Sequence, residues 1–152
     1  MRLLRAIGLT ILGFWAGVMA AAAMMKRVLR SRGDAEADEV ALVAIFDGID
    51  LGSRASAFRG GSMFAWFGGI SVDLRAATLS PEGAHLDLHA LNGGIAVTVP
   101  EGWRVRSNMR AVAGGVDARA PDPEGADAPT LTLDGFAVFG GVAVTAKPAV
   151  DE

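Results

Sequence analysis

Hydrophobic and polar residues alternate over most of the chain after about residue 40, in short runs that begin or end at glycine. Residues 91–105, LNGGIAVTVPEGWRV, show the pattern: Ile95, Val97 and Val99 occupy every second position after a glycine pair, and Pro-Glu-Gly follows. Alternation with a period of two predicts a β-strand with one buried face, and proline followed by glycine predicts the turn that ends it. A strand that begins on two glycines requires an explanation, because glycine weakens strands.

The glycine pair belongs to an internal repeat. Pairs stand at Gly68-Gly69, Gly93-Gly94, Gly114-Gly115 and Gly140-Gly141, with Asp47-Gly48 as a degenerate fifth copy. Their first positions are 21, 25, 21 and 26 residues apart. An alanine stands three residues before each pair, and a β-branched residue follows it directly, at Ile49, Ile70, Ile95, Val116 and Val142. Five copies of one pattern predict a structural unit repeated along the chain.

A repeat of about 21–26 residues is typical of one coil of a β-solenoid, in which stacked strands bury a continuous apolar column. The sequence therefore predicts an all-β domain, a short β-solenoid, over residues 40–148, with Ile70, Ile95, Val116 and Val142 in one column. The glycine pairs are then structural corners, where the chain needs a positive φ or where neighbouring backbones pass without a Cβ. Trp66, two residues before its pair, is expected in the core.

One transmembrane helix is expected before this domain. Residues 6–25 contain no charge and are long enough to cross the hydrocarbon layer of a bilayer, roughly 30 Å. Residues 1–5 form the N-terminal flank, residues 26–39 a polar linker and residues 149–152 a tail. A cleaved signal peptide is the alternative, because small residues near position 20 resemble a cleavage site. The basic residues after the helix favour a single-pass cell-membrane protein with its C-terminal domain on the cytoplasmic side.

Gly13 and Gly17 within this helix form a G-x-x-x-G pair. This spacing allows two membrane helices to approach closely and dimerise. Chance matches are common in a segment so rich in alanine and glycine, so both interpretations stay open.

The charge is unevenly distributed. Residues 1–32 contain six basic residues and no acidic residue, whereas residues 33–152 contain eight basic and all seventeen acidic residues, a formal charge of −9. An acidic domain is not expected to bind nucleic acid. The chain has no cysteine, which excludes disulfides and thiolate chemistry. The glycine pairs precede strands rather than helices, so no phosphate-binding motif is present and no cofactor is expected.

The only histidines stand close together. His85, Asp87 and His89 occupy alternate positions and would project from one face of a strand, where they could bind zinc or a similar ion. The alternative is that Leu86 and Leu88 fill the core and the polar residues face water. No nucleophile with an evident base is present, so we expect no catalytic residues.

Trp103, Arg104 and Arg106 follow a Pro-Glu-Gly turn. Tryptophan and arginine often dominate binding energy at interfaces, which makes these residues a candidate partner-binding site. Trp103 could instead cover an end of the solenoid.

Four segments carry a resemblance to a known family: FGGISVDLRAATL (67–79), LNGGIAVTVPEGWRV (91–105), VAGGVDA (112–118) and VFGGVAV (138–144). Over about residues 40–147 the chain resembles the C-terminal domain of the LiaF-like, cell-wall-active-antibiotic response family of bacteria. The resemblance implies a short β-solenoid akin to the bactofilin type. It also implies a membrane-associated, non-catalytic regulator of an envelope-stress sensor kinase, and it supplies no catalytic residues.

We therefore expect a non-enzymatic, membrane-anchored interaction or regulatory protein of the bacterial cell envelope, whose partner is a membrane sensor kinase or a second copy of the chain. One alternative is a structural solenoid of the bactofilin kind that self-assembles at the membrane. Another is a metal-dependent enzyme that uses His85, Asp87 and His89.

Overall fold

The computed structural model describes residues 2–28 and 33–150, and the side chains of residues 7–24 and 33–150. The chain divides into two compact units, the N-terminal helix and the strand-rich domain that follows it. Helix α1 (Arg2–Val28) contains a stretch from Ile7 to Met24 with a mean hydropathy of 1.9, long and apolar enough to cross a membrane. A signal sequence meets the same criterion, so the helix alone does not distinguish an anchor from a signal.

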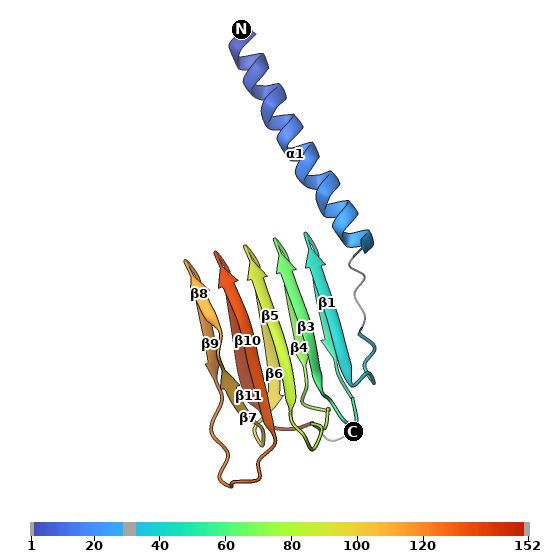
Figure 1. Ribbon diagram of the computed structural model, residues 1–152, viewed down its shortest axis with the longest axis vertical. Helices are drawn as coiled ribbons and strands as arrows, with labels where there is room; N and C mark the ends of the chain where they lie inside the picture. The colour runs from blue at the N-terminus through green and yellow to red at the C-terminus, as the bar shows by residue number, and fades with distance from the viewer. Residues whose placement is uncertain (1, 29–32, 151–152) are drawn as a thin grey trace. The chain divides into compact units, whose positions relative to one another are not determined.

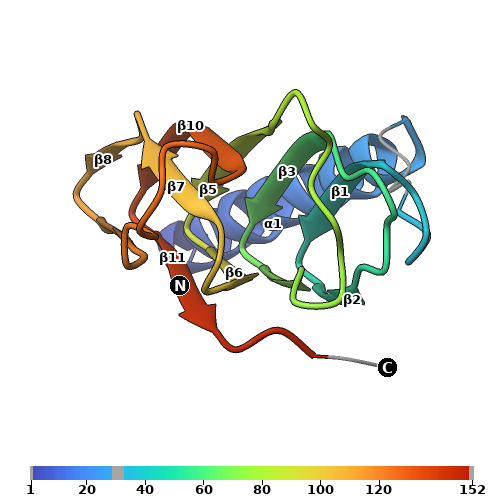
Figure 2. The ribbon, with the colours of Figure 1, turned by 90° about the horizontal axis from the view of Figure 1, so that it is seen from below.

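The second unit consists of two parallel β-sheets (Figures 1 and 2). Sheet A contains β1 (Glu39–Ile45), β3 (Gly60–Trp66), β5 (Ala84–Leu91), β7 (Arg104–Ser107), β8 (Arg110–Val112) and β10 (Thr130–Val138). Sheet B contains β2 (Gly48–Gly52), β4 (Gly69–Asp73), β6 (Gly94–Pro100), β9 (Gly115–Arg119) and β11 (Gly141–Lys147). The strands expected from the sequence are thus present, and they pair in parallel.

Each of the five sequence repeats supplies a strand to sheet A, a corner and a strand to sheet B, except that the fourth repeat supplies two short strands, β7 and β8, to sheet A. The repeats do not stack in chain order. Sheet B runs β2-β4-β6-β11-β9, so the fifth repeat lies between the third and the fourth (Figure 1). Sheet A follows the same order, and β7 and β8 together pair with one side of β10. A solenoid wound continuously along the chain would place the fourth repeat there instead.

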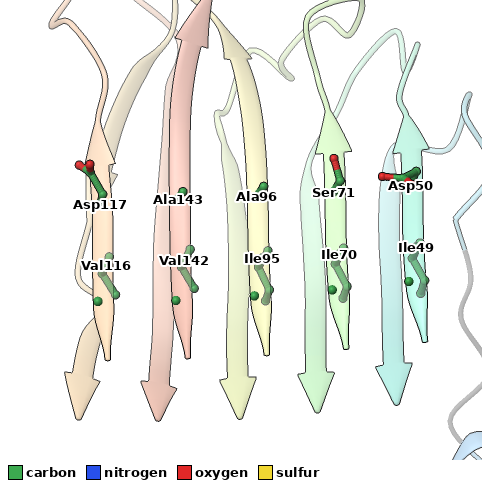
Figure 3. Close-up of a pocket in the computed structure, with 15 residues that line it drawn as sticks. Ile49, Asp50, Ile70, Ser71, Ile95, Ala96, Val116, Asp117, Val142 and Ala143 are labelled. Carbon is green, nitrogen blue, oxygen red and sulfur yellow. The ribbon is translucent and has the colours of Figure 1, made fainter. Parts of the chain in front are cut away.

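The chemistry of the repeats explains which of them occupy the edges. The outward position of sheet B is filled, in spatial order, by Asp50, Ser71, Ala96, Ala143 and Asp117 (Figure 3). The two carboxylates stand on the two edge strands, where water solvates them, and the small side chains stand on the strands between. An edge strand that carries charge also discourages pairing with another chain.

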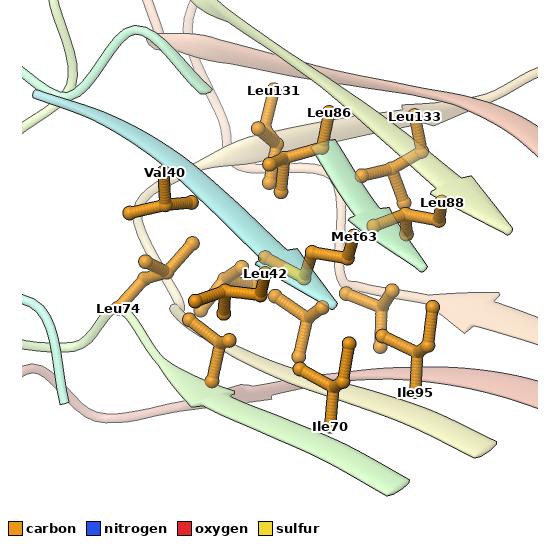
Figure 4. Packing of buried hydrophobic residues seen from close by; sticks show 14 of the residues in the cluster. Val40, Leu42, Met63, Ile70, Leu74, Leu86, Leu88, Ile95, Leu131 and Leu133 are labelled. Atoms are coloured by element: carbon orange, nitrogen blue, oxygen red, sulfur yellow. The ribbon is translucent and has the colours of Figure 1, made fainter. Parts of the chain in front are cut away.

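The core lies between the two sheets. Ile70, Ile95 and Val142 are each 2% exposed and lie in register in sheet B, with partly buried Val116 at the edge of the same row. The predicted apolar column is therefore confirmed. It faces leucines and a methionine of sheet A, among them Leu42, Met63, Leu86, Leu88, Leu131 and Leu133 (Figure 4).

The corner geometry decides between the two explanations for the glycine pairs. A left-handed φ, between 48° and 51°, falls on the residue before each pair: Phe46, Phe67, Asn92, Ala113 and Phe139. At the first glycine of each pair, a Cβ would lie 2.2–2.4 Å from a carbonyl oxygen of the neighbouring repeat. Glycine is present there because neighbouring backbones pass too closely for a side chain, and the positive φ falls one residue earlier.

Asp47 in the first repeat follows the same rule. The Cβ at Gly68 would point at the carbonyl oxygen of Asp47, and the Cβ at Gly93 would point at that of Gly68. Each Cβ thus points toward the preceding repeat of the stack. The first repeat has no sheet neighbour on that side within the described part of the chain, so a side chain fits, and the Asp47 carboxylate accepts a hydrogen bond from Gly48 N at 2.9 Å.

Part of the expected linker belongs to the folded domain. Gly33 packs against Leu42 and Leu51, so it covers the open end of the core beside the first repeat. Ala35 accepts a backbone hydrogen bond from Arg54, and an Arg54–Glu36 ion pair of 3.2 Å fastens the segment. The sequence prediction of a polar linker over 26–39 is therefore wrong for residues 33–38, which cap the stack.

Candidate functional site

The three candidate metal ligands do not converge. His85 Nε2 lies 3.4 Å from Asp87 Oδ1 and 3.4 Å from Asp134 Oδ2 of the adjacent strand β10. His89 packs its ring against Phe136 instead, with 4.6 Å between ring centroids. No group of three or more His, Asp or Glu side chains arranged to bind a metal occurs among the described residues. The strand places His85, Asp87 and His89 on the outer face of sheet A, as predicted, but as two separate contacts.

The three candidate partner-binding residues, Trp103, Arg104 and Arg106, lie in different surroundings. Trp103 is only 6% exposed and belongs to the hydrophobic core, where it closes the end of the core at the turns. Its proposed role in direct partner contact is therefore wrong, because a buried indole has no surface to offer. Arg104 Nε donates to Asp122 Oδ1 at 2.8 Å and its Nη2 donates to the Gly125 carbonyl at 2.8 Å, which fixes the loop 120–129. Arg106 is exposed.

Gly13 and Gly17 lie within α1, and a Cβ at either position would meet nothing within 4 Å. Both positions are thus sterically open on the helix surface. Helix dimerisation through them stays a prediction.

A bidentate ion pair lies at the end of β4. Arg75 Nη2 donates to Asp73 Oδ2 at 2.6 Å and Arg75 Nε donates to Asp73 Oδ1 at 3.0 Å, a bidentate geometry. The side-chain hydrogen bond from Arg75 lowers the pKa of the Asp73 carboxyl below its ordinary value, against the opposing effect of burial. This pair stabilises the turn after β4.

The outer face of sheet B forms a shallow groove of about 720 Å³ that runs across all five strands (Figure 3). Its floor contains the second glycine of every corner pair and the outward Ser71, Ala96 and Ala143, with Asp50 and Asp117 at its two ends. The groove exists because these side chains are so small that the flat backbone surface is exposed. This surface suits packing against another apolar element.

A second apolar surface follows the corners on the side of sheet A. Phe46, Phe67 and Phe139, the residues with left-handed φ, are 41%, 46% and 67% exposed. The rings of Phe46 and Phe67 stack in parallel with centroids 5.1 Å apart, and Trp66 packs against both. We call this surface the aromatic edge.

The sequence prediction placed Trp66 in the core, and this was wrong. Trp66 lies on the outer face of sheet A and is half-buried, whereas the adjacent alanines Ala44, Ala65, Ala90 and Ala137 are fully buried at the tight corner. The repeat itself contained the information needed to place Trp66. The position three residues before each glycine pair is always alanine, which indicates limited space in the core. The next position varies in size from Ile45 to Trp66, which indicates the outer face of the sheet.

Comparisons with known proteins identify no relative of this chain. No family model, no curated protein and no solved structure matches the chain. The resemblance to the LiaF-like family therefore stays a prediction that depends on the quoted segments.

Proposed function

We propose that the chain is a non-enzymatic, membrane-anchored interaction protein in which a short β-solenoid, with its last repeat inserted before the fourth, presents a docking face for a membrane protein partner. The observation that carries this proposal is the groove on sheet B. Its three central strands present the small side chains of Ser71, Ala96 and Ala143 outward, between Asp50 and Asp117 on the two edge strands, and this floor is suited to packing against a partner. By the resemblance of the sequence, the partner is an envelope-stress sensor kinase and the role is regulatory.

The anchor is the second part of the proposal. Helix α1 contains an apolar stretch from Ile7 to Met24, of which 6% is buried. An apolar surface of this length is costly to expose to water, which favours insertion into a bilayer. The stretch is longer than the apolar core of about 7–15 residues that is typical of a signal peptide, which favours a retained anchor. The basic residues that follow it favour a domain on the cytoplasmic side.

Two features favour regulation over end-to-end assembly. Residues 33–38 lie against the first repeat, where Ala35 and Asp38 accept hydrogen bonds from Arg54 N and Arg59 N, so they stand in the way of another copy at this end. At the opposite edge, the strand of sheet A is interrupted between β7 and β8, and Arg104, Arg106 and Arg110 stand on its two pieces. Interrupted and charged edge strands oppose sheet extension.

The proposal is tested by a bulky charge in the groove. Ala96 is exposed at the centre of sheet B, so Ala96→Arg is expected to keep the melting temperature of the full chain in detergent. Ala126→Arg, in the exposed loop 120–129, is the matched control. In a bacterial strain that lacks the chain, the wild type and the control should restore an envelope-stress reporter, whereas Ala96→Arg should not.

Full restoration of the reporter by Ala96→Arg at normal abundance would contradict the groove as the docking face. Release of the wild-type chain from membranes by alkaline carbonate would contradict the anchor, independently of the groove.

A further inference from the structure

We propose that the aromatic edge binds the lipid bilayer, inserting Phe46, Phe67 and Phe139 into its interfacial layer. This inference rests on the proposed function in one respect, that α1 spans the same membrane. It adds an orientation: the corners of the domain face the lipid and the turns at the opposite edge face away from it.

The fold does not require phenylalanine at these positions. The equivalent corners carry Asn92 and Ala113 with the same left-handed φ. Residues with a Cβ adopt this conformation at a cost, and asparagine bears it better than most. Phe139 lies between the corners of Asn92 and Ala113 in the stack and is 67% exposed. An aromatic ring placed at a strained and exposed position has a purpose outside the fold, and exposed apolar patches mark interaction surfaces.

The charge distribution separates the two edges of the domain. The central corner segments 66–71, 91–96 and 138–143 contain no charged residue. The carboxylates nearest the corners, Asp47, Asp50 and Asp117, lie in the outermost repeats. The turns at the opposite edge carry many charges of both signs, among them Arg75, Glu82, Glu101, Arg104 and Asp122. An edge with aromatic rings and few charges matches the membrane interface, whereas the heavily charged edge does not.

The tether keeps the domain at the membrane surface. Only residues 29–32 separate α1 from Gly33, and a peptide of this length spans at most about 18 Å. Gly33 packs against Leu42 in the middle of β1, and four residues of strand from there to Phe46 cover about 13 Å. The corners are thus within reach of the lipid. Because the anchor removes most of the entropic cost of association, a small apolar contact is sufficient.

The absence of cysteine permits a direct test in the full chain. Ala113→Cys places a single environment-sensitive fluorophore on the corner side, beside Phe139, and Ala126→Cys places one in the loop 120–129 at the opposite edge; both alanines are exposed. Each labelled chain is reconstituted into phosphatidylcholine vesicles with and without brominated acyl chains. We expect bromine to quench the fluorophore at position 113 and not at position 126.

Phe139→Asn, made in the labelled Ala113→Cys chain, removes one ring of the aromatic edge. This variant should fold, because Asn92 already occupies the equivalent position at another corner. It should lose the quenching while the melting temperature stays unchanged. Val150→Asn, at another exposed apolar residue, is the control and should retain the quenching.

Three outcomes would overturn the inference. If the chain also stays in the membrane fraction after carbonate treatment, the anchor is unaffected by them. The three outcomes are equal quenching at positions 113 and 126, quenching unaffected by Phe139→Asn, and a fluorophore at 113 that is shielded from water but not quenched. The last would mean that protein, such as a second copy of the chain, covers the edge. Carbonate release of the reconstituted chain would overturn the anchor itself, and the inference with it.

Discussion

The close passage of backbones at the corners predicts a large effect from a single methyl group. In Gly93→Ala, the new Cβ would lie 2.4 Å from the carbonyl oxygen of Gly68 and 3.2 Å from its nitrogen. These are backbone atoms of the neighbouring repeat, so they cannot rotate away as a side chain would. The same oxygen accepts the hydrogen bond of Gly94 N at 3.1 Å, which ties the two corners together.

The magnitude follows from these two contacts. Overpacking a close-packed site costs about 1–3 kcal/mol, and weakening the backbone hydrogen bond adds about 1 kcal/mol. We therefore expect Gly93→Ala to lower the free energy of unfolding by about 3 kcal/mol. For a domain of this size, that corresponds to a melting temperature lower by roughly 12 °C.

Gly94→Ala is the matched control, one residue away. Its Cβ would meet only the carbonyl oxygen of Gly141 at 3.9 Å, an ordinary contact, and Gly94 has no positive φ. It should be neutral or stabilising by up to about 1 kcal/mol, because alanine restricts the unfolded chain. Thermal unfolding of the full chain in detergent, followed by circular dichroism of the strands, measures both. Equal melting temperatures for Gly93→Ala and Gly94→Ala would refute the explanation of the glycine pairs.

Two further predictions concern the turns. Trp103→Ala should lower the free energy of unfolding by about 3–5 kcal/mol, because the indole is 6% exposed in the core, whereas exposed Arg106→Ala should not; similar melting curves for the two variants would contradict this. Arg75→Gln should raise the pKa of Asp73 toward its ordinary value of 3.8, measured by NMR titration of the carboxyl. Because the pKa in the folded protein is the lower one, the pair's stabilisation is complete above about pH 4 and is lost as the pH falls through that lowered pKa. An unchanged Asp73 titration in the variant would refute the assignment to Arg75.

The candidate surfaces were only partly predictable from sequence. His85, Asp87 and His89 do share one strand face, because alternation along a strand is a local property. Their partners are not local: Asp134 and Phe136 arrive from β10, more than forty residues later, and separate the group into two contacts. The groove was not predicted. Its cause is nevertheless visible in the sequence, because each central repeat has a small residue at the outward position.

The sequence by itself determined the repeat, the strands and the corners. These depend on short-range rules, namely alternation for a half-buried strand and glycine where backbones crowd. Ile95 is buried and Gly93 is at a corner because each repeat carries the same local pattern.

Only the tertiary structure decided how the repeats are ordered and which residues they leave exposed. All repeats present nearly the same hydrogen-bonding ladder, so periodicity cannot tell whether the fifth lies after the fourth or before it. The choice is made by solvation of whole strands: the repeat with Asp117 lies at an edge, and the more apolar repeat with Ala143 lies inside. Burial of Trp103 and exposure of Trp66 and Phe139 follow from that packing, because a side chain's surroundings are set by strands distant in the sequence.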